Sequence, residues 1–142
     1  MVAESVFIIA TLSLFIELVV LGLLAFGYYA KRSKNYRRHG ITMTTAVVLH
    51  LVTILGWMIW SLRNFLGAGS VDFGSFLGLA VLGHVVLGAI GVSLGVWLVA
   101  AWHLQTDVQK CFPRKRFMVV TIAAWAMAIL LGIMLYITVI LS

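Results

Sequence analysis

The stretch from Gly74 to His103, GSFLGLAVLGHVVLGAIGVSLGVWLVAAWH, decides the fold of this chain. It consists of apolar or small residues except for His84 in its interior and His103 at its end. A hydrocarbon core is crossed by roughly 20 helical residues, so this run is long enough to span a membrane. At about 100° per residue, Gly88, Gly91 and Gly95 lie within about 40° of His84. The stretch therefore predicts a membrane helix with an imidazole beside a surface that lacks side chains.

The composition of the whole chain is typical of an integral membrane protein. Its 142 residues are 63% hydrophobic and 10% charged, whereas a soluble globular domain is about 45–50% apolar and 25% charged. Apolar runs that are long enough to span a membrane lie at about 6–30, 41–62, 74–102 and 117–141. The one proline, Pro113, lies between the last two runs, so we expect no break inside a membrane helix. These features predict an all-α, four-helix membrane bundle that forms a single domain over residues 1–142.

The positions of the basic residues predict how the helices are oriented in the membrane. The first connection has Lys31, Arg32, Lys34, Arg37 and Arg38, the third has Lys110, Arg114, Lys115 and Arg116, and the second has only Arg63. Because Lys and Arg are enriched in cytoplasmic loops, this pattern predicts a multi-pass plasma-membrane protein with both basic loops in the cytoplasm. The termini and the second loop are then outside. Contact with anionic lipid accounts for the net charge of +6, and we expect no nucleic-acid partner.

Three predicted helices each place one ionisable side chain at a similar depth. These side chains are Glu17, His50 and His84. Counted from the outer helix ends, the two histidines differ in depth by about 4.5 Å at 1.5 Å per residue. An ionisable residue at this depth is costly, so it faces the bundle interior and has a partner. A structural hydrogen bond explains each group alone, but the shared depth favours a metal or cofactor bound by His50 and His84. Glu17 is then a tuning or proton-linked group, or a protonated acid bound to a neighbouring helix.

Two further histidines lie near the ends of predicted helices. His39 shares a helix face with Met43 and His50. It is therefore either a solvated residue at the aqueous boundary or part of a second binding site there. We expect His103 to be interfacial, and the methionines of the fourth helix to be core residues rather than ligands.

Two imidazoles on antiparallel helices at similar depth are what a six-coordinate haem b requires, since each supplies one axial nitrogen. In this interpretation Gly88, Gly91 and Gly95 let the porphyrin approach the helix backbone. The alternative is a copper or zinc ion, because imidazole suits both metals and Glu17 or a methionine can complete the ligand set. Gly91-x-x-x-Gly95 is also a helix-packing motif, so the glycines favour haem only modestly.

Three runs resemble the archaeal branch of a small membrane family catalogued as domain of unknown function 420. They are RRHGITMTTAVVLH (37–50), LGHVVLG (82–88) and CFPRKRFMVVTIAAW (111–125), and the similarity covers about residues 37–136. The resemblance implies relatives that include a maturation factor for haem-copper terminal oxidases, with histidines as metal or haem ligands. His39 and His84 match the family positions, and His50 matches the archaeal form. Bacterial members have a further histidine before the fourth helix, where this chain has Arg114, Lys115 and Arg116 instead.

Together these patterns predict a membrane protein that binds haem b for electron transfer or haem handling in a respiratory chain. The alternatives are a metal-binding assembly factor for a haem-copper terminal oxidase, with copper as the alternative cofactor, and a non-catalytic structural subunit of a membrane complex. Expected partners are lipid, respiratory-complex or oxidase subunits, and a quinone between helices. No pattern of a nucleophile triad, a phosphate-binding loop or paired catalytic carboxylates is present in the sequence. We therefore expect an electron carrier or assembly factor rather than an enzyme.

Overall fold

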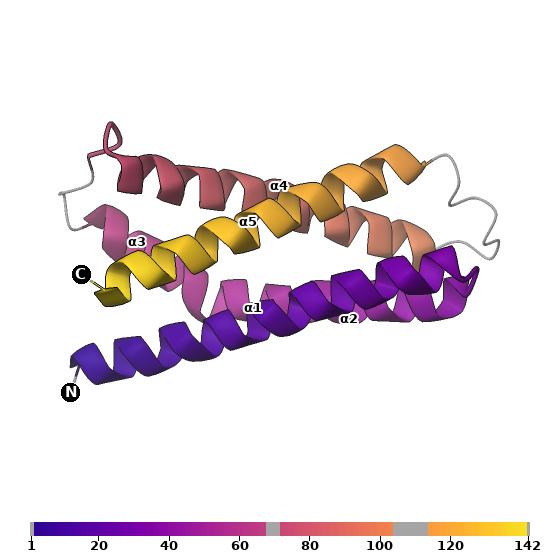
Figure 1. Ribbon diagram of the computed structural model, residues 1–142, viewed down its shortest axis with the longest axis horizontal. Coiled ribbons are helices and arrows are strands. Elements are labelled where there is room, and N and C mark those ends of the chain that lie inside the picture. Colours follow the sequence, from indigo (N-terminus) through magenta and orange to yellow (C-terminus); the bar gives the residue numbers. More distant parts are fainter. Residues whose placement is uncertain (1, 68–71, 104–113, 142) are drawn as a thin grey trace.

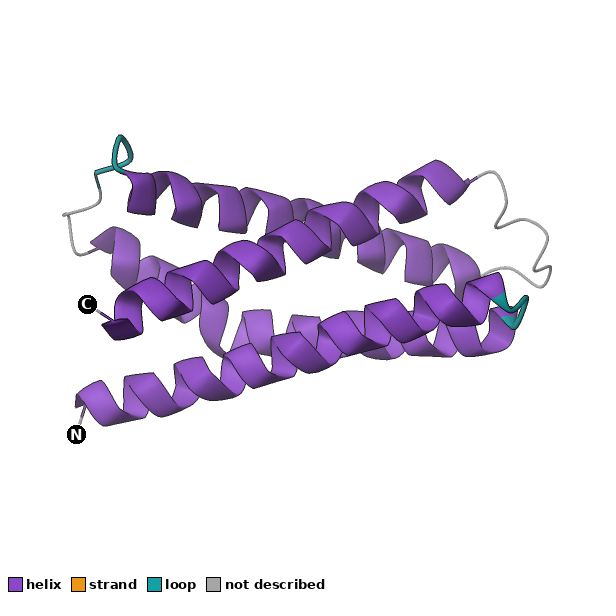
Figure 2. Ribbon diagram, viewed as in Figure 1, coloured by secondary structure: helices purple, strands orange, loops and turns teal. Residues whose placement is uncertain are grey.

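The computed structural model describes residues 2–67, 72–103 and 114–141, and nearly all of these residues are helical (Figure 2). The elements are α1 (Val2–Arg32), α2 (Tyr36–Thr53), the π-helical turn η1 (Ile54–Met58), α3 (Ile59–Gly67), α4 (Phe76–His103) and α5 (Lys115–Leu141). Four helical spans are long and apolar enough to cross a membrane: Phe7–Arg32, Tyr36–Asn64, Phe76–His103 and Lys115–Thr138. The predicted all-α, four-helix membrane fold is confirmed.

The outer surface of the bundle is apolar on every span. Phe15, Leu55, Phe76 and Val119 are each more than half exposed, and they represent a much larger set of exposed large apolar side chains. Lipid acyl chains are the surroundings in which such a surface is stable, because they are as apolar as the side chains themselves. The multi-pass membrane character and the contact with lipid follow from this surface.

A tight turn joins α1 to α2 and sets the register of the first hairpin. Lys34 adopts a left-handed conformation, with φ of 58°, at the point where α1 ends. Asn35 then caps α2, because its side-chain oxygen accepts a hydrogen bond from the backbone N–H of Arg38 at 3.1 Å. As a result α2 runs back along α1, and two histidines of α2 lie directly beside it.

The bundle consists of two hairpins, α1 with α2 and α4 with α5, which pack more extensively within each hairpin than against each other. Figure 1 shows the two termini at one end of the bundle and the α1–α2 turn at the other. The side chains between the hairpins form the buried core: Val20, Leu24, Ala46, Val47, Trp125 and Ile129. Trp125 is the largest fully buried side chain among the described residues, at 1% exposed, and it occupies the centre of this core.

The second span is not the uninterrupted helix that the sequence predicts. At η1 the backbone N–H of Ile59 donates to the carbonyl of Ile54, five residues earlier, instead of four. Such a π-turn bends a helix, and Figure 1 shows α3 leaving the line of α2 and turning toward α4. The prediction was wrong here because it took proline as the only sign of a break, and this break contains no proline.

Candidate functional site

Glu17 of α1 and His50 of α2 form a buried pair across the first hairpin. The imidazole Nδ1 lies 2.7 Å from carboxylate Oε1, and the two residues are 6% and 4% exposed. The antiparallel register of the hairpin brings them to the same level, as the depth count from the sequence predicts. An ionisable group inside a membrane bundle requires such a partner.

Unpaired polar atoms surround this pair. Among the buried side chains of the described residues, Glu17 Oε2, His50 Nε2 and Trp125 Nε1 have no hydrogen-bond partner. The rings of His50 and Trp125 lie against each other, with their centroids 4.7 Å apart and their planes tilted by 52°. A buried polar group without a partner costs about 1–3 kcal/mol, and native proteins contain few of them. Each of these three atoms is therefore free to bind a further group.

His84 of α4 is held by the second hairpin. Its Nδ1 lies 2.8 Å from the backbone carbonyl of Ala128 in α5, and the ring is partly buried. Gly132 makes room for this ring, since a Cβ there would lie 3.0 Å from Cε1 of the imidazole. His84 is therefore fixed by a neighbouring helix, as His50 is.

His39 has the same arrangement nearer the α1–α2 turn. Its Nδ1 lies 2.8 Å from the backbone carbonyl of Gly27 in α1. A carbonyl oxygen only accepts hydrogen bonds, so Nδ1 of His39 and of His84 is the donor, and in the neutral ring the lone pair is on Nε2. When Glu17 is ionised, its carboxylate likewise only accepts, so Nδ1 of His50 is the donor and Nε2 of the neutral ring holds the lone pair. An imidazole anchored through one nitrogen, with the other left as a donor atom, is the usual arrangement of a metal-ligating histidine.

The glycine face of α4 packs against α5. A Cβ at Gly91 would lie 3.3 Å from Cα of Trp125, and one at Gly95 would lie 3.2 Å from the Trp125 ring and from Val47. The neighbouring Gly88 faces Ala128 at 4.0 Å by the same measure. The absence of side chains therefore serves close packing of α4 on Trp125 in this structure. The role of these glycines as a porphyrin surface stays a prediction, and it requires α5 and its Trp125 side chain to move away from α4.

Two further observations concern the metal-ligating residue types among the described residues. They contain no group of three or more His, Cys, Asp and Glu side chains arranged to hold a metal ion. His103 is exposed and lies 3.2 Å from the Thr44 hydroxyl through Nε2, as an interfacial residue can.

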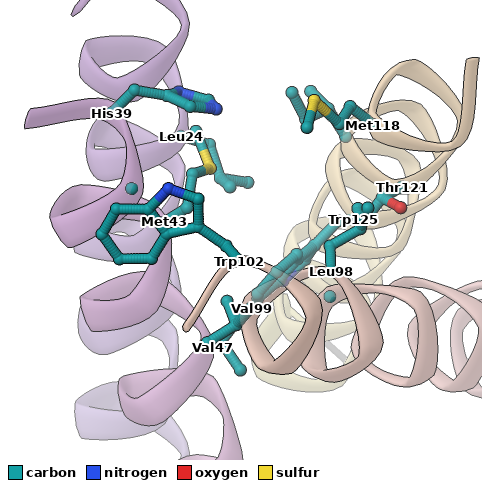
Figure 3. Close-up of a pocket in the computed structure, with 13 residues that line it drawn as sticks. Leu24, His39, Met43, Val47, Leu98, Val99, Trp102, Met118, Thr121 and Trp125 are labelled. Carbon is teal, nitrogen blue, oxygen red and sulfur yellow. The ribbon is translucent and has the colours of Figure 1, made fainter. Parts of the chain in front are cut away.

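Sequence reasoning named a second binding site at His39 as one alternative, but it did not indicate Trp125 or the cavity beside His39, which Figure 3 shows. A tryptophan in an apolar helix has no distinguishing pattern, and the helix face to which it belongs is visible only in the packed bundle.

No protein-family model matches this chain, and no curated protein and no solved structure matches it. The resemblance to domain of unknown function 420 therefore stays a prediction from the three sequence runs.

Proposed function

We propose that this protein binds a metal-centred cofactor through histidine inside the membrane and serves electron transfer or cofactor handling in a respiratory chain. The observation that supports this proposal is the buried, unpartnered Nε2 of His50, with Glu17 bound to the opposite nitrogen of the ring. A carboxylate behind an imidazole fixes the ring orientation and makes the free nitrogen a stronger ligand. A pair that only joined two helices would gain nothing from burying Nε2 without a partner, which costs free energy.

The first candidate cofactor is haem b, with His50 and His84 as its two axial ligands. The two residues belong to different hairpins, and these hairpins pack less extensively on each other than internally, which favours insertion of a flat group between them. Because the Trp125 ring packs on His50 and Gly95 and the Trp125 backbone covers Gly91, haem binding here must displace the Trp125 side chain and move α5 away from α4. The protein would supply the axial nitrogens, and Glu17 would tune the basicity of one of them.

The second candidate is a copper ion bound at the Glu17–His50 pair, in a factor for assembly of a haem-copper oxidase. One observation favours it over haem: with Trp125 covering Gly91 and Gly95, an ion needs far less rearrangement of the core than a macrocycle. The respiratory partner and the plasma membrane belong to the proposal as well. We also propose the orientation predicted from the basic loops, in which the end of the bundle with Lys31 and Arg32 faces the cytoplasm.

Absorption spectra of the detergent-purified protein, oxidised and reduced with dithionite, test the proposal together with elemental analysis. We expect sharp b-type bands in the parent and in the His103→Ala control, whose histidine is exposed. The bands should be lost in His50→Ala and His84→Ala. Stoichiometric copper without such bands, lost in His50→Ala, would select the second candidate. A protein expressed with ample haem and copper that contains neither would refute the proposal.

A further inference from the structure

A second set of ligand atoms lies around a cavity nearer the α1–α2 turn than the Glu17–His50 pair. The cavity has a volume of about 60 Å³, and its walls come from α1, α2, α4 and α5. Three of its lining residues have nitrogen or sulfur donors, namely His39, Met43 and Met118. Figure 3 shows His39 of α2 and Met118 of α5 pointing toward one another from opposite sides of the cavity.

Gly27 of α1 positions two of these side chains. Its carbonyl accepts the hydrogen bond from Nδ1 of His39, which leaves Nε2 with a lone pair. The terminal methyl of Met43 packs where a Cβ of Gly27 would be, so the missing side chain makes room for the thioether. The histidine and the methionine are therefore held on the same side of the cavity by one residue of the neighbouring helix.

The chemistry of the lining selects the kind of ligand. The three donors are neutral, and no carboxylate lines the cavity. Most of the remaining wall is apolar, including Leu24 and Val99. An apolar wall without a negative charge is a poor place for a divalent cation. Thioether and imidazole donors together suit a soft monovalent ion, and Cu(I) is the biological ion of this type.

We propose that this cavity binds one Cu(I) ion through Nε2 of His39 and the sulfur atoms of Met43 and Met118. Its ligands differ from those of the cofactor proposed at His50 and His84, although both sites border Gly95 and Trp125, and the inference does not depend on that cofactor. It also gives Met118 a role that the sequence did not indicate, since methionines in the fourth helix are expected to be core residues.

Lys31 is a charged group beside the proposed ligands, and its Nζ donates to the sulfur of Met118 at 3.9 Å. Its positive charge opposes a bound cation, and it opposes a divalent ion twice as strongly as a monovalent one. Lys31 has a long, flexible side chain at the end of α1, so its head can move toward water when Met118 binds a metal. The residue therefore adds to the selection for Cu(I) and predicts that its neutralisation strengthens binding.

Competition for Cu(I) with a chromophoric chelator under anaerobic conditions tests the proposal on the full-length protein in detergent. Ag(I), which does not change oxidation state, serves as a second probe. We expect Met43→Leu and Met118→Leu each to weaken binding by about tenfold or more, which corresponds to at least 1.4 kcal/mol. Leucine keeps the volume of methionine, so the fold should persist, and circular dichroism checks it. Met127→Leu is the matched control on α5, because Met127 is 51% exposed.

Two further variants separate this site from the one at the bundle centre. Lys31→Gln should tighten Cu(I) binding, and His50→Ala should leave it unchanged. A parent protein that does not bind one equivalent of Cu(I), or leucine variants that bind it like the parent, would overturn the proposal. Loss of copper in His50→Ala but not in Met43→Leu would also overturn it, and would support copper at the Glu17–His50 pair instead.

Discussion

Removal of the Glu17 side chain tests whether a buried polar pair holds α1 against α2. Glu17→Ala leaves Nδ1 of His50 without its partner at 2.7 Å, in a position where His50 is 4% exposed. An unsatisfied buried group costs about 1–3 kcal/mol. Hydrogen bonds between membrane helices average about 0.6 kcal/mol and reach about 1.7, because the unfolded state in the membrane also finds partners. We therefore expect a coupling energy of about 0.6–2 kcal/mol between the two side chains.

A double-mutant cycle of Glu17→Ala, His50→Ala and the double variant measures this coupling. Unfolding in mixed micelles of increasing SDS content, followed by circular dichroism, gives the free energy of unfolding of each protein. Leu18→Ala is the control, since Leu18 follows Glu17 in α1 but is 46% exposed toward the lipid. Independent sites add within about 0.3–0.5 kcal/mol. Additive effects within that range would mean that the pair is not formed in the folded protein.

Two further predictions use the same unfolding assay. Gly91→Ala should destabilise the bundle by about 1–3 kcal/mol, because the new methyl group meets the backbone of Trp125 at 3.3 Å. Gly22→Ala should instead stabilise the bundle by up to about 1 kcal/mol. A Cβ at Gly22 meets nothing within 4 Å, and alanine is the better helix former. Equal effects of the two variants on the free energy of unfolding would contradict the packing of α4 on α5. Asn35→Ala should lower the free energy of unfolding by about 1 kcal/mol, because α2 loses the side-chain cap on the Arg38 N–H. An unchanged midpoint of SDS unfolding would contradict the capping role of Asn35.

The number and type of the helices follow from the sequence because hydropathy decides them. Four long apolar runs in a chain that is 63% hydrophobic have no stable alternative to membrane helices. Hydropathy does not mark the ends equally well: α2 begins at Tyr36, five residues before the expected 41, because Arg37 and Arg38 are helical although they are charged. The π-turn at Ile54–Met58 depends on a shift of backbone hydrogen bonds, which has no apolar or polar pattern.

The site was predictable only where polar residues mark a helix face. Glu17 and His50 were found together because ionisable groups are rare at that depth and must face inward. The partner of His84 is a backbone carbonyl, that of Ala128, and no side-chain pattern indicates it. No side-chain pattern indicates the inward-facing positions of Trp125 and Met118 on α5 either. In a soluble protein an apolar stripe reveals the buried face, but lipid is as apolar as the core, so that signal is lost in a membrane helix.

Replacement of Glu17 and His50 by leucine separates a structural role from ligand binding. Exchanging both partners of a buried hydrogen bond for apolar residues of similar shape can be nearly neutral or stabilising. The Glu17 Oε2 and His50 Nε2 atoms, which have no partner in the described part of the chain, add to the cost of keeping the native pair. We therefore expect the Glu17→Leu/His50→Leu variant to unfold at the same or a higher SDS content than the parent. It should nevertheless lose the cofactor bound at His50 in absorption spectra and elemental analysis, because the Nε2 ligand of His50 is removed. A leucine variant that keeps the parent's cofactor stoichiometry would show that the pair only joins α1 to α2, whereas a stable variant without cofactor would identify ligand binding as the reason for the pair.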